Sequence, residues 1–156
     1  MQEYVLVFPF DPREQGRIML IRKAKPEWQR GRLNLVGGKV EPGESFDDAA
    51  VREFAEETQV PADGFRRVGT IRSDNSDFLL GVYTCLARDT DIVSEPLERV
   101  DWFDWDDVKN DPALMDNLKT VIPLILAGME GWAIWHGRYD GEPAMFLDWE
   151  TQYCHA

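Results

Sequence analysis

Short apolar runs separated by polar turns make up much of the chain, and runs of this length predict β-strands. The segments expected to form strands are residues 5–10, 18–21, 33–36, 68–71, 78–86 and 100–103. The polar segment 11–16 is expected to turn between the first two strands, and the strands at 68–71 and 78–86 are expected to pair as a hairpin.

Residues 46–58 carry the apolar spacing of an amphipathic helix, and the residues around its start fit that prediction. Ser45 is expected to be the N-cap. Asp47 and Asp48 fall in the first turn, where acidic side chains favour the positive end of the helix dipole. The helix is therefore expected to begin at Phe46.

A second main helix is expected at residues 115–127, ended by Gly128. Pro123 lies inside this segment and is expected to kink or break the helix, because proline has no backbone N–H to donate. A short acidic helix is expected at residues 105–109.

The order of these elements favours an α/β fold, with a mixed β-sheet covered by helices on both faces. A length of 156 residues is that of one domain. We expect a single domain over residues 1–156, with residues 129–156 as a C-terminal extension packed on it. The aromatic segment 132–149, divided by Asp140-Gly141, is expected to form a hairpin against the domain or a second subunit.

Composition narrows the class of protein. A hydrophobic content of 44% fits a globular domain, and two cysteines argue against a disulfide scaffold, with Cys85 expected in the core. The sequence shows no signal peptide or membrane-length apolar run, so we expect a cytoplasmic protein without membrane contact. A net charge of −12 argues against binding nucleic acid through a broad basic surface.

Charge is unevenly distributed along the chain. Residues 1–39 carry eight Lys and Arg against four Asp and Glu, whereas residues 40–156 carry nine against twenty-five. The basic part leads into Gly37-Gly38-Lys39, where bare backbone and one cation can approach a phosphate. Most of these basic residues are equally compatible with solvated surface positions, but Lys39 lies in the loop itself.

Three carboxylates share one side of the helix at residues 46–58. At about 100° per residue, Glu53, Glu56 and Glu57 fall within roughly a 100° sector. That sector continues a stripe that includes Ala49 and Ala50 and that an amphipathic helix turns toward the core. Like charges crowded beside a core need a cation among them, although a solvated glutamate face is the simpler alternative.

The chemistry of these ligands favours one class of metal. Oxygen-only ligands indicate Mg²⁺, with Mn²⁺ as a substitute, because zinc is expected to recruit His or Cys. The glycine loop that precedes the helix favours a metal-phosphate site over the solvated face.

Residues 38–60 resemble the signature of the Nudix hydrolases, in the MutT-like part of that family. The signature is Gly, five residues, Glu, seven residues, Arg-Glu, an apolar residue, any residue, Glu-Glu, any residue, Gly and an apolar residue. The matching positions are Gly38, Glu44, Arg52, Glu53, Phe54, Glu56, Glu57 and Val60. Gln59 stands where the signature has its second glycine, at the end of the helix, and implies strain of roughly 1 kcal/mol or a different helix exit.

The resemblance implies an α/β/α sandwich and a division of labour among the residues of the signature. Glu53, Glu56 and Glu57 would hold Mg²⁺, Arg52 would brace these carboxylates, and Glu44 would stabilise the loop. Gly37, Gly38 and Lys39 would lie against the phosphates.

The resemblance also implies the reaction, in which water attacks a nucleoside diphosphate linked to another group. The general base would be Glu53 or a glutamate outside the signature, and Glu98 is the outside candidate because it precedes the strand at residues 100–103. An ordinary loop acid is the alternative for Glu98.

Three residues resemble the base-binding side chains of the branch that acts on oxidised purine nucleoside triphosphates. Asn34 resembles its base-reading asparagine, and Trp102 and Asp104 resemble a Trp-Phe-x-Asp stretch. An aromatic ring can stack on a base while an amide and a carboxyl bind its edge. The alternative is that Trp102 serves to pack the fold and does not bind a base.

The expected function is hydrolysis of a nucleoside triphosphate, oxidised or otherwise modified, to nucleoside monophosphate and pyrophosphate. A nucleotide sugar, ADP-ribose or a dinucleoside polyphosphate is the alternative substrate, and a non-catalytic nucleotide sensor is the competing class of function. The chain retains every carboxylate of the signature, which favours an enzyme. The expected partner is a small-molecule nucleotide, for a monomer or a homodimer.

Overall fold

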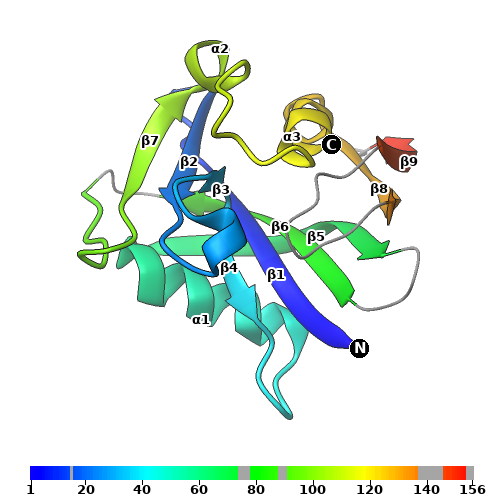
Figure 1. The fold of residues 1–156 in the computed structure, drawn as a ribbon, viewed down its shortest axis with the longest axis horizontal. Coiled ribbons are helices and arrows are strands. Elements are labelled where there is room, and N and C mark those ends of the chain that lie inside the picture. Colours follow the sequence, from blue (N-terminus) through cyan, green and yellow to red (C-terminus); the bar gives the residue numbers. More distant parts are fainter. Residues whose placement is uncertain (15, 74–77, 88–90, 137–145, 154–156) are drawn as a thin grey trace.

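The fold is built from two β-sheets and a few helices (Figure 1). A computed structural model describes residues 1–14, 16–73, 78–87, 91–136 and 146–153. Its strands are β1 (Gln2–Phe10), β2 (Arg17–Arg22), β3 (Leu33–Asn34), β4 (Val36–Lys39), β5 (Ala62–Ser73), β6 (Phe78–Ala87), β7 (Val100–Asp104), β8 (Met129–His136) and β9 (Phe146–Tyr153). Its helices are η1 (Glu27–Gln29, a 3-10 helix), α1 (Phe46–Thr58), α2 (Trp105–Val108) and α3 (Leu118–Leu126).

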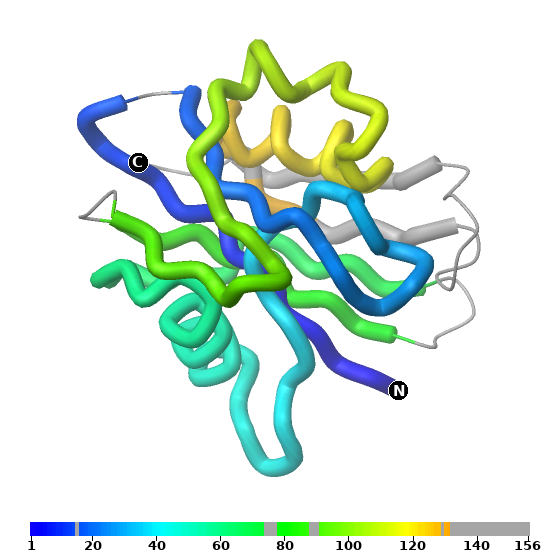
Figure 2. Tube along the Cα trace, turned by 60° about the vertical axis from the view of Figure 1, so that its left-hand side comes forward, coloured from blue at the N-terminus to red at the C-terminus, as the bar shows by residue number. Residues whose placement is uncertain are grey.

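The larger sheet is mixed, with strand order β4-β1-β6-β5-β8-β9. β1 runs antiparallel to β4 and parallel to β6, while β5 runs antiparallel to β6 and parallel to β8. The smaller sheet has the order β3-β2-β7. Helix α1 lies on one side of the larger sheet and α3 on the other (Figures 1 and 2), so the expected mixed sheet between helices is confirmed.

Period-two alternation divides the interior into two cores, one on each side of β1. Val5 and Val7 pack with Ala50 and Phe54 of α1. Leu6 and Phe8 belong to the opposite core, which includes the buried residues of α3. Because successive side chains of a strand point to opposite faces, a run that is apolar throughout is what a strand buried on both faces requires.

Helix α1 has the bounds that the sequence predicts, Phe46–Thr58. The backbone N–H of Asp48 donates to Ser45 Oγ at 3.0 Å, so the predicted N-cap is confirmed. The hairpin expected from residues 68–71 and 78–86 is also confirmed, since β5 and β6 pair antiparallel.

One predicted strand, residues 33–36, is wrong as a single element. β3 pairs with β2 in the smaller sheet, whereas β4 pairs with β1 in the larger one. The physical reason lies at Leu35, whose backbone N–H donates to Asn34 Oδ1 at 2.8 Å instead of to a neighbouring strand. This side-chain bond ends one ladder before the next begins.

The second main helix is shorter than the sequence predicts. α3 begins at Leu118 rather than at residue 115, because the backbone N–H of Met115 donates to Leu33 O at 2.9 Å and holds that residue beside β3. The predicted break at Pro123 is wrong, since α3 continues through this residue. Pro123 is on the exposed side of the helix, where solvent can satisfy the carbonyl that loses its donor.

The C-terminal hairpin is confirmed by the antiparallel pairing of β8 with β9, and β8 extends the larger sheet by pairing with β5. The expected turn at Asp140-Gly141 and the residue Cys154 lie outside the described residues. Cys85 is buried, as expected.

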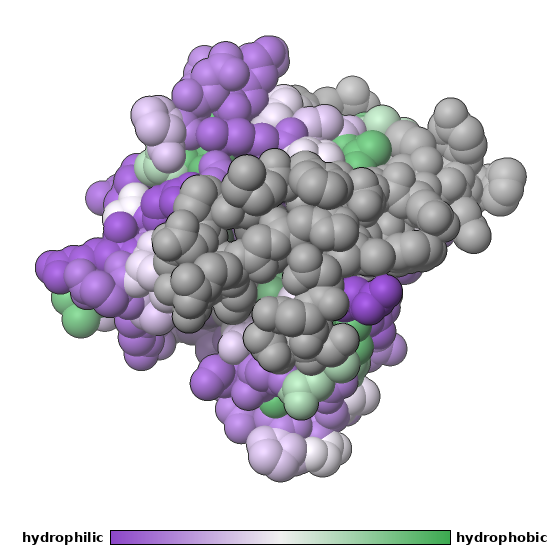
Figure 3. All heavy atoms as spheres, turned by 45° about the vertical axis from the view of Figure 1, so that its right-hand side comes forward, coloured by the Kyte–Doolittle hydropathy of each residue, from purple (hydrophilic) through white to green (hydrophobic). Residues whose placement is uncertain are grey.

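The described surface is mainly hydrophilic on the face seen in Figure 3, where hydrophobic residues occur as small separate areas. No helix among the described residues has both the length and the apolar character needed to span a membrane.

Gln59 ends helix α1 in a left-handed conformation, with φ of 54° and ψ of 22°. It is the one non-glycine residue with positive φ in the described part of the chain. The departure from the signature therefore leaves the backbone turn in place, and the Cβ atom of Gln59 bears the strain.

Replacing Gln59 with glycine should stabilise the protein by about 0.5–1 kcal/mol, because the relief of strain exceeds the added freedom of the unfolded chain. Thermal unfolding should show a melting temperature higher by roughly 1–4 °C. Gln59→Ala is the control, since alanine removes the side chain but keeps the strained Cβ. A glycine variant no more stable than the alanine variant would contradict this explanation.

Candidate active site

A cavity of about 770 Å³ brings most of the predicted site residues together. The three helix carboxylates and Glu98 line it, as do Gly37, Gly38, Lys39 and Asn34. Apolar side chains of β1, β5 and β6 form another part of its wall. One chamber therefore joins a group of carboxylates and a glycine-bearing strand to an apolar surface.

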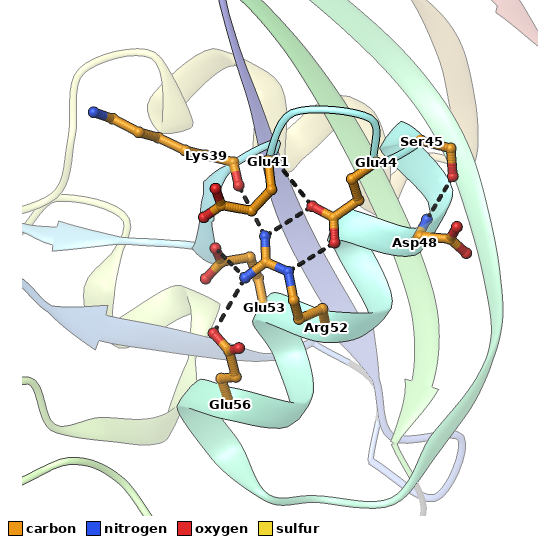
Figure 4. A network of polar contacts seen from close by, with 8 residues as sticks. All are labelled: Lys39, Glu41, Glu44, Ser45, Asp48, Arg52, Glu53 and Glu56. Atoms are coloured by element: carbon orange, nitrogen blue, oxygen red, sulfur yellow. Dashed lines mark hydrogen bonds and ion pairs between the residues drawn. The ribbon is translucent and has the colours of Figure 1, made fainter.

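Arg52 organises the carboxylates of α1 (Figure 4). Its Nε and Nη2 atoms donate to the two carboxylate oxygens of Glu44 at 2.7 and 2.9 Å. Its Nη1 donates to Glu53 Oε1 at 2.9 Å and to Glu56 Oε2 at 3.2 Å. Since Nη2 also donates to the carbonyl of Lys39 at 2.9 Å, one guanidinium links the helix to the glycine-bearing strand.

Glu44 is held from two directions. Besides the bidentate pair with Arg52, its Oε1 accepts the backbone N–H of Glu41 at 3.1 Å. These hydrogen bonds, that of Arg52 first, lower the pKa of Glu44 to about 2. The contacts are those that a structural role in the loop requires, and Glu44 stays charged at any pH at which the protein is expected to work.

The two glycines of β4 are required by close neighbours. A Cβ atom on Gly37 would lie 1.9 Å from the carbonyl oxygen of Val5, and one on Gly38 would lie 2.5 Å from the carboxyl group of Glu53. Gly37 therefore allows β1 to approach, and Gly38 leaves the space that the Glu53 carboxylate occupies.

Glu57 is the most perturbed carboxyl group of the cavity. Its Oε2 atom is buried and has no hydrogen-bond partner among the described residues. Burial is the main cause that raises the pKa of Glu57 to about 8, and the nearby carboxylates Glu53 and Glu98 raise it further, against the attraction of Lys23. Near neutral pH this residue therefore holds a proton in the absence of a cation.

The donor set fits an oxygen-preferring divalent ion. Glu53, Glu56 and Glu57 reach the same cavity from one helix, and the unpaired oxygen of Glu57 is the kind of atom that a cation would satisfy. Within the described residues, no group of three His, Cys, Asp or Glu side chains is already arranged to enclose a metal. Arg52 Nη1 pairs with one carboxylate oxygen of Glu53 and with one of Glu56, at 2.9 and 3.2 Å.

Glu98 lies in the same cavity, as the sequence hypothesis requires of a general base. Its carboxylate accepts the backbone N–H of Ala24 at 2.9 Å and pairs with Lys23 Nζ at 3.1 Å. Partial burial acts to raise the pKa of Glu98, but these bonds outweigh it and lower the pKa below its ordinary value. The catalytic role of Glu98 stays a prediction, and in this arrangement it is a weak base.

The structure does not bring Trp102 and Asp104 to the cavity that Asn34 lines. Trp102 packs against the core under α1, with the Arg17 guanidinium 5.4 Å from its ring centroid, and lines a separate surface hollow. Asp104 is exposed at the end of β7. The expected base-binding trio is therefore not assembled, because β7 directs these side chains away from the cavity.

Sequence reasoning missed the residues that accompany Asn34 in the cavity. They are Trp28, Gln29, Met115 and Asn117. Trp28 and Gln29 belong to η1, a helix too short to show a periodic pattern of apolar residues. Asn117 stands just before α3, where an asparagine is an ordinary residue at the start of a helix. The polar residues just before the second helix were the one available signal for Asn117.

The metal-free protein should lose stability as the pH rises. Because the folded state holds the Glu57 proton up to about pH 8 and the unfolded chain releases it near its ordinary value of 4.5, the free energy of unfolding falls between these values. The slope is at most about 1.4 kcal/mol per pH unit. Urea unfolding in a chelator at pH 5.5 and 7.5 should show a larger fall for the wild type than for Glu57→Gln, whereas parallel behaviour would contradict the raised pKa.

Known proteins share both the sequence pattern and the fold. The sequence model of the NUDIX domain family matches residues 2–125. The "Oxidized purine nucleoside triphosphate hydrolase" of Danio rerio is 33% identical over 101 residues, covering 61% of this chain and 63% of that protein, which is under two thirds of its length. The protein of that name from Mus musculus is 34% identical over 110 residues, covering 67% of each chain.

Solved structures show the same fold at lower sequence identity. The "mMutator MutT protein" of Bacillus halodurans superimposes with a TM-score of 0.71 at 20% identity, over 96% of this chain and 98% of that one. A NUDIX hydrolase of Nitrosomonas europaea gives a TM-score of 0.67 at 18% identity, over 93% and 76%. The family match covers most of the chain, and the helix that carries the three carboxylates is in place. The chain therefore belongs to the Nudix hydrolase family.

Proposed function

We propose that this protein is a Mg²⁺-dependent pyrophosphohydrolase that cleaves a nucleoside triphosphate to nucleoside monophosphate and pyrophosphate. The observation that carries the proposal is the single cavity in which Glu53, Glu56 and Glu57 share one chamber with an apolar wall. A triphosphate joined to a base has the same two parts, one highly charged and one flat and apolar.

Two lysines supply positive charge where a polyphosphate would enter. Lys25 and Lys39 both line the cavity, and neither forms an ion pair with another described residue. Lys23 is already paired with Glu98 at 3.1 Å. The two unpaired ammonium groups can therefore bind phosphate oxygens without first losing a protein partner.

Glu53, Glu56 and Glu57 would hold Mg²⁺, which when bound neutralises phosphate charge and lowers the pKa of a coordinated water. Arg52 keeps the Glu53 carboxylate against Gly38 and so fixes its direction. Glu57 must give up its proton to become a ligand. Glu53 and Glu98 both remain candidates to take the proton of the attacking water.

The apolar part of the cavity supports a nucleobase over a sugar as the group beyond the phosphates. Phe78, Leu80 and Met115 are nearly buried and line this part, and Trp28 adds an aromatic face. A ring of an oxidised purine can pack on such a surface, whereas a sugar presents hydroxyl groups that it would leave unpaired. The two relatives named as oxidised purine nucleoside triphosphate hydrolases support the same class of substrate.

Glu57→Gln should lower Mg²⁺-dependent turnover of the preferred nucleoside triphosphate by at least about a hundredfold, because a neutral amide replaces a ligand carboxylate. Glu41→Gln makes the same chemical change at an exposed residue of the neighbouring loop and should leave turnover unchanged. The assay separates the products from a panel of nucleoside triphosphates, oxidised purine triphosphates, nucleotide sugars and ADP-ribose. Full activity in Glu57→Gln, or release of orthophosphate in place of pyrophosphate, would overturn the proposal.

A further inference from the structure

Four residues in register across the larger sheet connect the charged part of the cavity to its apolar part. Tyr4 of β1 is paired with Lys39 of β4 on one side and with Leu80 of β6 on the other, and Leu80 is paired with Ile71 of β5. All four residues line the cavity. Because neighbouring strands are about 4.8 Å apart, this row extends about 14 Å from a cation to an apolar wall.

The two ends of the row differ in chemistry. Arg52 of α1 donates from Nη2 to the carbonyl of Lys39 at 2.9 Å, so the carboxylates of α1 lie at the β4 end. Leu80 and Ile71, at the other end, are nearly buried among apolar side chains. A nucleotide bound with its phosphates at the carboxylates therefore has its base over β6 and β5.

The sugar of such a nucleotide lies over β1, because the sugar joins the phosphates to the base. Alternation along the strand places Tyr4 and Leu6 on the same face of β1, and both line the cavity. Leu6 is buried opposite Gly37, whereas Tyr4 is half-buried. Tyr4 is therefore the side chain of β1 that can contact the sugar.

The ring of Tyr4 offers the sugar a mainly apolar surface. It packs against the core that contains Leu80, and burial raises the pKa of its hydroxyl, so the side chain stays uncharged. The CH₂ group at C2′ of a deoxyribose can pack on such a ring. The 2′-hydroxyl of a ribose in the same place would lose its water without gaining a hydrogen-bond partner.

We infer that Tyr4 selects the sugar of the substrate, with its ring packed against C2′, and that the enzyme favours a 2′-deoxynucleoside triphosphate over the ribonucleotide. The inference rests on the proposed function and specifies the sugar of its substrate. The selection depends on the ring of Tyr4 and not on its hydroxyl. An apolar site rejects an added hydroxyl by about tenfold to a hundredfold, which is the preference expected here.

The test measures binding without catalysis, by calorimetry with 8-oxo-dGMP and 8-oxo-GMP, which differ only at C2′. The wild type should bind the deoxy compound about tenfold to a hundredfold more tightly. Tyr4→Phe keeps the ring and should keep this ratio of affinities. Tyr4→Val removes the ring, retains a residue type that favours strands, and should bring the two affinities within about threefold of each other.

Phe10→Val is the matched control. Phe10 is a partly buried aromatic residue on the same face of β1, and it is not among the described residues that line the cavity. Its replacement should leave the ratio at the wild-type value. Each ratio compares two ligands on one variant, so a general loss of stability affects both alike, and thermal unfolding checks that each variant is folded.

Three results would overturn the inference: a wild type that binds the two monophosphates equally or binds neither, a ratio lost in Tyr4→Phe, or a ratio retained in Tyr4→Val. If Tyr4→Val does not fold, the ratios of the wild type and Tyr4→Phe decide. Cleavage of triphosphates to pyrophosphate without a preference for either sugar refutes the inference and leaves the proposed function standing. Ring-dependent preference for 8-oxo-dGMP without cleavage of any triphosphate gives the reverse.

Discussion

The contacts of Arg52 hold together the part of the molecule on which the rest of the site depends. Three glutamates within two turns of one helix repel each other, and a core lies beneath them. A single guanidinium reduces this repulsion at Glu53 and Glu56 and ties both to Glu44 and to the carbonyl of Lys39. Glu57 has a buried oxygen without a hydrogen-bond partner among the described residues, and burial is the main cause that raises its pKa.

The two-core architecture explains how charged and apolar walls meet in one chamber. Helix α1 brings carboxylates from one side of the larger sheet, while the segment before α3 brings Met115 and Asn117 from the other. The break between β3 and β4 at Leu35 moves the chain from one sheet to the other and leaves Asn34 at the junction. The same hydrogen bond that ends β3 thus also orients an amide toward the cavity.

The sequence predicts best where one local rule decides the structure. The helix at Phe46–Thr58 and its Ser45 cap follow from spacing and residue type, and both are present. At Gln59 the sequence leaves strain or a different helix exit open, and the structure has the left-handed turn. The cavity beyond the carboxylates depends on long-range pairing, such as that of Leu33 with Leu114, which no local pattern contains. The residue type of Trp102 suggests stacking on a base, but the alternation of β7 directs its side chain toward the core under α1.

The most direct test of this account is the proton balance of Mg²⁺ binding. Calorimetric titration at pH 7 in two buffers of different ionisation enthalpy measures the protons released per metal bound. Because burial holds the pKa of Glu57 at about 8 without a cation, the wild type should release close to one proton and Glu57→Gln almost none. Mg²⁺ binding to the wild type without proton release, or with the same release in the variant, would contradict the central role of Glu57.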